Sequence, residues 1–239
     1  MCFIHGFSLT EGLQLWYDKL VRRVSAVSFL PGGENVELQD LQWDQKLKIN
    51  TVGLDETHTD LHHNRYEATP YGVLNRLVEQ GFVPRESYWI DYGCGKGRVG
   101  LFLNKMTGCR VTGVEFQEAL WQCAIENCRT SGAEGVRFVC GNAERFGIED
   151  ADHFYFFSPF SVPILQRVMN RILQSYYENP RRLRFFFYYP TEEYAAELMH
   201  SELVFVEKVD CRDLFPVEDS REHILIFEMP GLQSGESVL

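Results

Sequence analysis

A glycine-rich segment that begins with an aspartate is the clearest chemical feature of the sequence. It reads DYGCGKG and follows the apolar run YWI, so Asp91 stands where a strand is predicted to end. Gly93, Gly95 and Gly97 have no Cβ, so the backbone can turn sharply there and approach a ligand closely. A pyrophosphate is bound by backbone N–H groups without a neighbouring carboxylate, whereas a carboxylate favours an ammonium or sulfonium group. Asp91 therefore favours a positively charged ligand that lacks phosphate.

The same glycines allow a second interpretation. Gly95, Gly97 and Gly100 form the pattern G-x-G-x-x-G of dinucleotide-binding proteins, and an acid, Glu115, follows twenty residues after Gly95. In such proteins the glycines begin directly at the strand end, which they do not do here. The pattern of P-loop nucleotide-binding proteins is excluded, because no Ser or Thr follows the lysine of GKG. Lys96 and Arg98 are expected to point to solvent.

The chain around this loop alternates between strands and helices. Short apolar runs predict the strands, and apolar residues three or four positions apart predict the helices. The predicted strands are 88–91, 110–116, 136–141, 153–160, 183–190, 203–210 and 222–229, and the predicted helices are 98–106, 117–131, 161–177 and 191–200. This alternation predicts an α/β fold, a doubly wound, mostly parallel and Rossmann-like sheet of seven strands. No helical pattern separates the last two strands, so they are predicted to be antiparallel.

Ahead of this core, residues 1–69 are predicted to form an extension that caps the site, and residues 70–239 form the main domain. Residues 10–29 carry an apolar stripe typical of an amphipathic helix, which could form a dimer face or pack over the core. Residues 36–65 are polar and irregular in pattern. A helix is predicted from Pro70 to about Gln80.

Composition limits the classes of function. The formal net charge is −11, which disfavours a nucleic-acid partner, because phosphate is normally met by a basic surface. Two arginine clusters, at 22–23 and in RRLR at 181–184, are the local exceptions and are interpreted as solvated faces. No apolar run is long enough to span a membrane, and no secretory signal is recognised. Seven cysteines at uneven spacing predict free thiols, no metal site and a cytoplasmic protein.

Four segments, in this order, resemble the motifs of class I S-adenosylmethionine (SAM)-dependent methyltransferases. They are DYGCGKG, the acid in GVEF that ends the second core strand, GNAERF after the third, and FFSPF at the fourth. The resemblance covers roughly residues 70–229 and includes the antiparallel terminal pair. More narrowly, YEATPY followed by DYGCGKGRV and FSPFS resembles a group of small bacterial methyltransferases of unassigned substrate. It implies SAM as cofactor and S-adenosyl-L-homocysteine (SAH) as its product.

The resemblance also implies a cofactor site. It assigns the glycine loop with Asp91 to the methionine part of SAM, Glu115 to the ribose hydroxyls and Asn142 to the adenine amino group. The full set of implied cofactor-binding residues is Asp91, Gly93, Gly95, Gly97, Glu115, Phe116, Asn142, Ala143 and Ser158.

The sequence SPF, with Ser158 and Phe160, resembles the [DNS]-P-P-[YF] loop of amino-group methyltransferases, with Phe160 in place of the second proline. By this resemblance the Ser158 hydroxyl would accept hydrogen bonds from an amine, and Phe160 or Tyr71 would pack on it. Tyr66, Thr69 and Tyr71 directly precede the core and are expected at the mouth of the site. Methyl transfer needs alignment and exclusion of water rather than a nucleophilic triad.

Three classes of function remain. A methyltransferase that acts on an N or O nucleophile is favoured, with a small molecule or a protein side chain preferred over nucleic acid as acceptor. An NAD(P)-dependent oxidoreductase is the first alternative, and the position of Asp91 opposes it. A catalytically silent SAM-binding interaction domain is the second.

Overall fold

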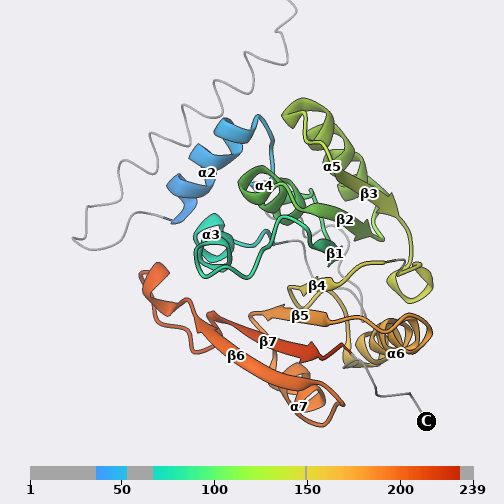
Figure 1. Ribbon diagram of the computed structural model, residues 1–239. Helices are drawn as coiled ribbons and strands as arrows, with labels where there is room; N and C mark the ends of the chain where they lie inside the picture. The colour runs from blue at the N-terminus through green and yellow to red at the C-terminus, as the bar shows by residue number, and fades with distance from the viewer. Residues whose placement is uncertain (1–35, 53–66, 149, 232–239) are drawn as a thin grey trace, which may run out of the picture.

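The computed structural model describes residues 36–52, 67–148 and 150–231, and its centre is a seven-stranded sheet (Figure 1). The strands are β1 (Tyr88–Tyr92), β2 (Arg110–Glu115), β3 (Val136–Cys140), β4 (His153–Phe156), β5 (Leu183–Tyr188), β6 (Val204–Asp210) and β7 (His223–Met229). Their order across the sheet is β3-β2-β1-β4-β5-β7-β6, and β7 runs antiparallel to both of its neighbours. The predicted fold, a mostly parallel sheet with an antiparallel final pair, is confirmed. The sequence did not predict that β7 would be inserted between β5 and β6.

Helices cover both faces of the sheet (Figure 1). On one face lie α3 (Tyr71–Glu79), α4 (Arg98–Thr107) and α5 (Glu118–Ser131), and on the other lie α6 (Val162–Glu178) and α7 (Glu192–Met199). Two short 3₁₀ helices follow β3 and β6, η1 (Ala143–Arg145) and η2 (Arg212–Leu214). The five α-helices α3 to α7 were predicted, and their ends differ from the prediction by one or two residues.

The helix α2 (Val36–Leu47) lies in a segment that was predicted to be irregular, so that prediction is wrong for these residues. Its buried positions recur at the spacing of one helix face, but two of them are acids, Asp40 and Asp44, beside Leu41. An acid on the buried face breaks the apolar stripe by which an amphipathic helix is recognised. The predicted helix at 10–29 lies outside the described residues, and the division into two domains stays a prediction.

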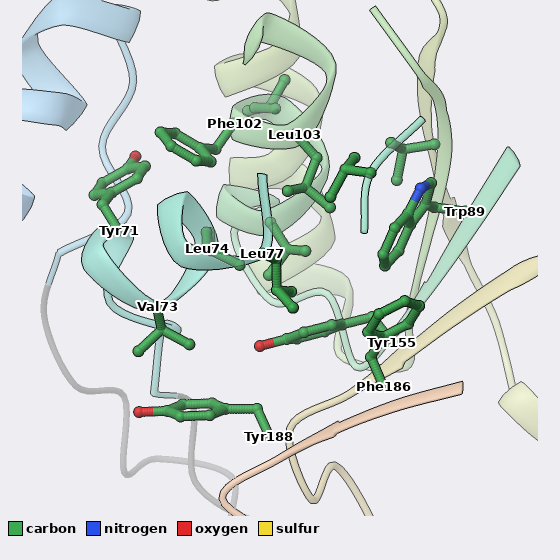
Figure 2. Packing of buried hydrophobic residues seen from close by; sticks show 14 of the residues in the cluster. Tyr71, Val73, Leu74, Leu77, Trp89, Phe102, Leu103, Tyr155, Phe186 and Tyr188 are labelled. Atoms are coloured by element: carbon green, nitrogen blue, oxygen red, sulfur yellow. The ribbon is translucent and has the colours of Figure 1, made fainter. Parts of the chain in front are cut away.

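Strand residues alternate between two apolar cores. Trp89, Tyr155 and Phe186 point to the core shared with α3 and α4, whereas Ile90 and Phe154 point to the core shared with α6 and α7. Figure 2 shows the first core, in which Trp89, Tyr155 and Phe186 gather from three neighbouring strands. Strands buried on both faces read as continuous apolar runs, which is how the central strands could be found in the sequence.

The described part of the chain carries no sign of a membrane span, a metal site or a disulfide. No helix there is long and apolar enough to cross a membrane. No group of three or more His, Cys, Asp or Glu residues is arranged there to hold a metal ion, and the cysteines there are free thiols.

Candidate functional site

A pocket lies at the carboxyl ends of β1, β2 and β4, where the order of the strands along the sheet changes direction. Its wall is completed by residues 141–144 after β3, by the first turn of α4 and by residues 67–69 ahead of α3. Parallel strands bring their carboxyl ends to one edge of a sheet, so motifs far apart in the sequence meet there.

Asp91, on β1, is the central charged residue of the pocket and is only 3% exposed. In the sheet it lies between Gly113 of β2 and Tyr155 of β4. Its Oδ2 atom is buried and has no hydrogen-bond partner among the described residues. Burial raises the pKa of Asp91 to about 8, and the nearby charge of Glu115 adds to the rise. A cationic group bound here would give Oδ2 a partner and favour the ionised carboxylate.

Glu115 ends β2 and contributes a second carboxylate to the pocket. Its Oε2 accepts the backbone N–H of Gly95 and its Oε1 accepts that of Gln117, each at 2.8 Å. These bonds fix the carboxylate beside the glycine loop. Because a carboxylate oxygen can accept more than one hydrogen bond, this geometry is compatible with further donors from a ligand. The role of Glu115 toward a ribose stays a prediction.

The glycines of the loop differ in what their missing Cβ permits. Gly93 has φ +73°, and a Cβ there would lie 2.4 Å from the Cβ of Pro159. Gly97 has φ +87°, and a Cβ there would lie 2.4 Å from Cζ of Phe138. Gly93 lines the pocket and lets the loop after β4 approach, whereas Gly97 allows α4 to pack against the sheet. Gly95 is linked to the site through its bond to Glu115.

The segment after β3 forms another part of the wall, with Asn142 and Ala143. Asn142 Oδ1 accepts the backbone N–H of Glu144 at 2.8 Å, and its Nδ2 donates to the carboxylate of Glu144 at 3.1 Å. Glu144 also pairs with Arg167 of α6. Phe116, just after β2, lines the pocket with 55% of its surface exposed. The structure therefore brings these predicted residues to the same pocket as Asp91 and Glu115.

Arg98 is buried, so the prediction that it points to solvent is wrong. It is the first residue of α4, is 3% exposed and lines the pocket. Its guanidinium pairs with Asp40, and its Nε donates to Thr51 Oγ1 at 2.6 Å and its Nη1 to the carbonyl of Thr69 at 3.2 Å. Lys96 is half-buried and contacts a backbone carbonyl of the extension, at 3.4 Å.

The prediction that Tyr71 lies at the mouth of the site is also wrong. Its side chain is completely buried, and its hydroxyl donates to Asp44 Oδ1 at 2.6 Å. Figure 2 shows its ring beside Phe102, with the ring centroids 5.1 Å apart. Tyr71 therefore cannot contact a methyl acceptor. Thr69 does line the pocket, and Tyr66 lies outside the described residues.

The two predicted residues of the SPF segment are placed differently. Phe160 lines the pocket. Ser158 is buried with a left-handed φ of +40°, and its Oγ donates to the carbonyl of Tyr189 at 3.3 Å. The Ser158 side chain is not part of the pocket wall formed by the described residues. The chain leaves the sheet before Ser158, which is why β4 ends earlier than predicted.

Sequence reasoning missed several residues of the site. Tyr155 lines the pocket, and its hydroxyl lies 3.1 Å from Thr69 Oγ1. Phe157 lines it as well. Alternation along β4 could have shown that Tyr155 faces the side of Asp91, because Phe154 and Phe156 face the other core. No sequence signal pointed to Asp40 of the extension.

The arginines of RRLR are hydrogen-bonded or ion-paired to other parts of the fold. Arg181 donates to the backbone carbonyl of Ser175 at 3.1 Å. Arg182 and Arg184 both pair with Glu228 of β7, at 2.6 and 3.2 Å.

The strand order and the pocket at the carboxyl edge define a Rossmann-like fold of the class I methyltransferase type. Residues 90–178 match the family model described as a methyltransferase domain. This match and the fold are similar to those of class I SAM-dependent methyltransferases, which favours this class over an oxidoreductase. No curated protein matches the chain in a sequence search.

Solved structures share this fold. An RNA methyltransferase from Salinibacter ruber, in complex with SAH, is 18% identical with a TM-score of 0.50, over 71% of this chain and 98% of that one. A SAM-dependent methyltransferase from Clostridium acetobutylicum is 14% identical with a TM-score of 0.52, over 69% and 94%. A dimethyladenosine transferase from Plasmodium falciparum is 13% identical with a TM-score of 0.50, over 69% and 63%. At these identities the likeness shows the fold alone.

Proposed function

We propose that the protein uses SAM to methylate an N or O nucleophile of a small molecule or of a protein side chain. The observation that carries the proposal is the buried Oδ2 of Asp91, which faces no hydrogen-bond donor among the described residues although its carboxylate lines the pocket. A buried polar atom without a partner is costly, and a bound cationic group would satisfy it. The second carboxylate, Glu115, makes the pocket unsuited to a pyrophosphate.

The described residues fit SAM. The ammonium group of its amino acid part would lie at Asp91, its ribose hydroxyls at Glu115, and its adenine between Phe116 and Asn142. Gly93 lets the loop after β4 approach this end of the pocket, because a Cβ there would lie 2.4 Å from the Cβ of Pro159. When bound, the sulfonium group supplies an activated methyl group for an in-line displacement.

The remaining part of the pocket would receive the methyl acceptor. Thr69, Tyr155, Phe157 and Phe160 line it, so three of these four side chains are aromatic. Such a wall excludes water and orients the acceptor by packing, which is the main requirement of this reaction. The Thr69 and Tyr155 hydroxyls, 3.1 Å apart, are the polar groups available here to position a nucleophile.

Charge supports a small molecule or a protein side chain over nucleic acid. The net charge is −11, and Arg98 is the one Lys or Arg among the described residues that line the pocket. The arginines at 181–184 are engaged by Glu228 and by backbone carbonyls. Nucleic-acid binding depends on basic groups that reach phosphates.

Calorimetry with SAH and with NAD tests the proposal. We expect SAH to bind and to raise the free energy of unfolding by about 2.7 kcal/mol at a hundred times its dissociation constant. Asp91→Asn and Glu115→Gln should each weaken SAH binding about tenfold or more, since each removes a charge-assisted contact. Glu126→Gln, an exposed acid on α5 that pairs with Arg129, is the matched control and should leave binding unchanged. Binding of NAD without SAH, or of neither ligand, would overturn the proposal.

A further inference from the structure

The end of the pocket proposed for the methyl acceptor is rich in hydrogen-bond acceptors and poor in donors. Glu67 and Thr69 line it from the segment ahead of α3, and Tyr155 lines it from β4. The Tyr155 hydroxyl lies 3.1 Å from Thr69 Oγ1, so one hydroxyl donates to the other and one hydroxyl hydrogen remains. An ionised Glu67 carboxylate can only accept hydrogen bonds. These side chains therefore suit a ligand that donates hydrogen bonds.

Arg98 does not provide a cation for this end of the pocket. Its Nε donates to Thr51 at 2.6 Å and its Nη1 to the Thr69 carbonyl at 3.2 Å. Asp40 pairs with the guanidinium, and Asp44 lies 4.0 Å from Nη2. Two acids of α2 thus balance its charge inside the fold. Because Arg98 is the one Lys, Arg or His in the described pocket wall, an anionic acceptor would meet no available cation there.

A second carboxylate lies behind the pocket wall on the same side. Tyr188 donates to Glu222 at 2.6 Å, and its ring packs on that of Phe157, a wall residue, with centroids 4.7 Å apart. Burial raises the pKa of Glu222, and the nearby charge of Glu67 adds to the rise. The two carboxylates are therefore close enough to interact, and a cation bound between the wall and the mouth would stabilise both.

The remaining wall of this end consists of aromatic rings. Tyr155, Phe157 and Phe160 line it. An aromatic ring attracts a cation to its face and packs against an apolar group. Burial raises the pKa of Tyr155 far above its usual value, so its hydroxyl stays neutral and keeps its accepting lone pairs.

We propose that the methyl acceptor is an alkylamine, in which an ammonium group is attached to an apolar body. The ammonium group binds at Glu67 and the Thr69–Tyr155 hydroxyl pair, and the apolar body packs on Phe157 and Phe160. The inference rests on the proposed function and narrows its nucleophile from N or O to N.

The chemistry of an amine is consistent with this wall. The bound ammonium group loses one proton to solvent, and the lone pair of its nitrogen then forms a bond to the methyl carbon of SAM. The carbon–sulfur bond breaks, and its electron pair stays on sulfur, which gives SAH. The product is a methylated ammonium ion. Hydrogen bonds from the nitrogen to the Thr69 and Tyr155 oxygens would orient its lone pair toward the methyl group.

The test uses two matched pairs of ligands, which are titrated by calorimetry into the protein saturated with SAH. One pair is 2-phenylethylamine and 2-phenylethanol, and the other is Nα-acetyl-lysinamide and Nα-acetyl-norleucinamide. In at least one pair the amine should bind about tenfold more tightly than its neutral counterpart, because it adds a charged contact and a cation–π contact. The preferred pair shows whether the amine belongs to a small molecule or to a lysine side chain. With radiolabelled SAM, the preferred amine should become methylated and its neutral counterpart should not.

Variants show whether the preference arises in this wall. Phe157→Leu should weaken amine binding about fivefold through the loss of a cation–π contact. Glu67→Gln should weaken it about threefold, since Glu67 is exposed. Neither change should alter binding of the neutral counterpart by more than about twofold. Glu193→Gln is the matched control, because it removes the same charge from an exposed position on α7 and should leave amine binding unchanged.

The other outcomes separate the inference from the proposed function. If SAH binds but neither amine binds better than its neutral counterpart, the inference is overturned and the proposed function stands. An amine preference that survives unchanged in both Phe157→Leu and Glu67→Gln places the amine elsewhere and also overturns the inference. If Phe157→Leu does not fold, Tyr155→Phe replaces it and should reduce the preference. Absence of SAH binding overturns the proposed function itself.

Discussion

Two pairs of buried acids, Asp40 with Asp44 and Asp91 with Glu115, differ in how completely their carboxylate oxygens are hydrogen-bonded. Asp44 of α2 accepts hydrogen bonds from Thr51 and Tyr71, and Asp40 pairs with Arg98. Asp91 on β1 has a buried oxygen without a partner among the described residues. Asp40 and Asp44 join the extension to the core, whereas Asp91 and Glu115 line the pocket.

The electrostatics of the two regions follow from this difference. Burial raises the pKa of Asp40, but the charge of Arg98 and the N–H of Tyr71 act against the rise. At Asp91 the same burial is reinforced by Glu115, and the pKa reaches about 8. A partner within the fold thus opposes the effect of burial on the pKa of Asp40, whereas at Asp91 the effect of burial is unopposed.

The largest expected difference is in stability. Asp44→Ala should lower the free energy of unfolding by about 3–5 kcal/mol, because it removes the acceptor of several buried donors and a charge beside Arg98. Asp91→Ala should change it by less than about 1 kcal/mol at pH 7.5 or increase it, since no donor bonds its buried oxygen. Urea denaturation of both variants measures this contrast. Equal losses in the two variants would contradict it.

The second prediction concerns pH. The ionised form of Asp91 is the one that attracts an ammonium group, so SAH binding should release a proton below the pKa of about 8. The affinity should rise by about tenfold per pH unit from pH 6 toward 8, where the ammonium group of the ligand remains charged. Asp91→Asn should bind weakly and without this dependence. Calorimetry in two buffers of different ionisation enthalpy detects the proton, and a flat profile in the unmodified protein would disprove the role of Asp91.

The smallest effect is expected at a predicted site residue that already has a partner. The Ser158 hydroxyl donates to the carbonyl of Tyr189, so Ser158→Ala should cost about 1 kcal/mol of stability. Turnover and SAH affinity should change by less than about threefold, because the pocket wall does not include this side chain. Phe160→Ala, in the same segment, serves as the comparison and should lower turnover more. A large loss of turnover in Ser158→Ala would place its hydroxyl in the site after all.

Much of the fold and the glycine loop could be predicted because their signals are local. Strands buried on both faces appear as short apolar runs, and Asp91 with Gly93 marks the turn at a strand end. Helix α2 was missed because its buried face carries Asp40 and Asp44, which look like surface residues until their partner is known. The position of Tyr71 was mistaken for a different reason: its place next to the core in the sequence does not show which way its side chain faces.

The sequence alone determined the order of the elements, the class of the fold and the acid beside the glycine loop, because each depends on residues that are near one another in the chain. Only the tertiary structure decided that β7 lies between β5 and β6 and that Arg98 turns inward to the acids of α2. It also decided that the Asp91 carboxylate has a buried oxygen without a hydrogen-bond partner among the described residues. Those outcomes depend on contacts between residues far apart in sequence, where burial and the balance of charges are settled by the assembled fold.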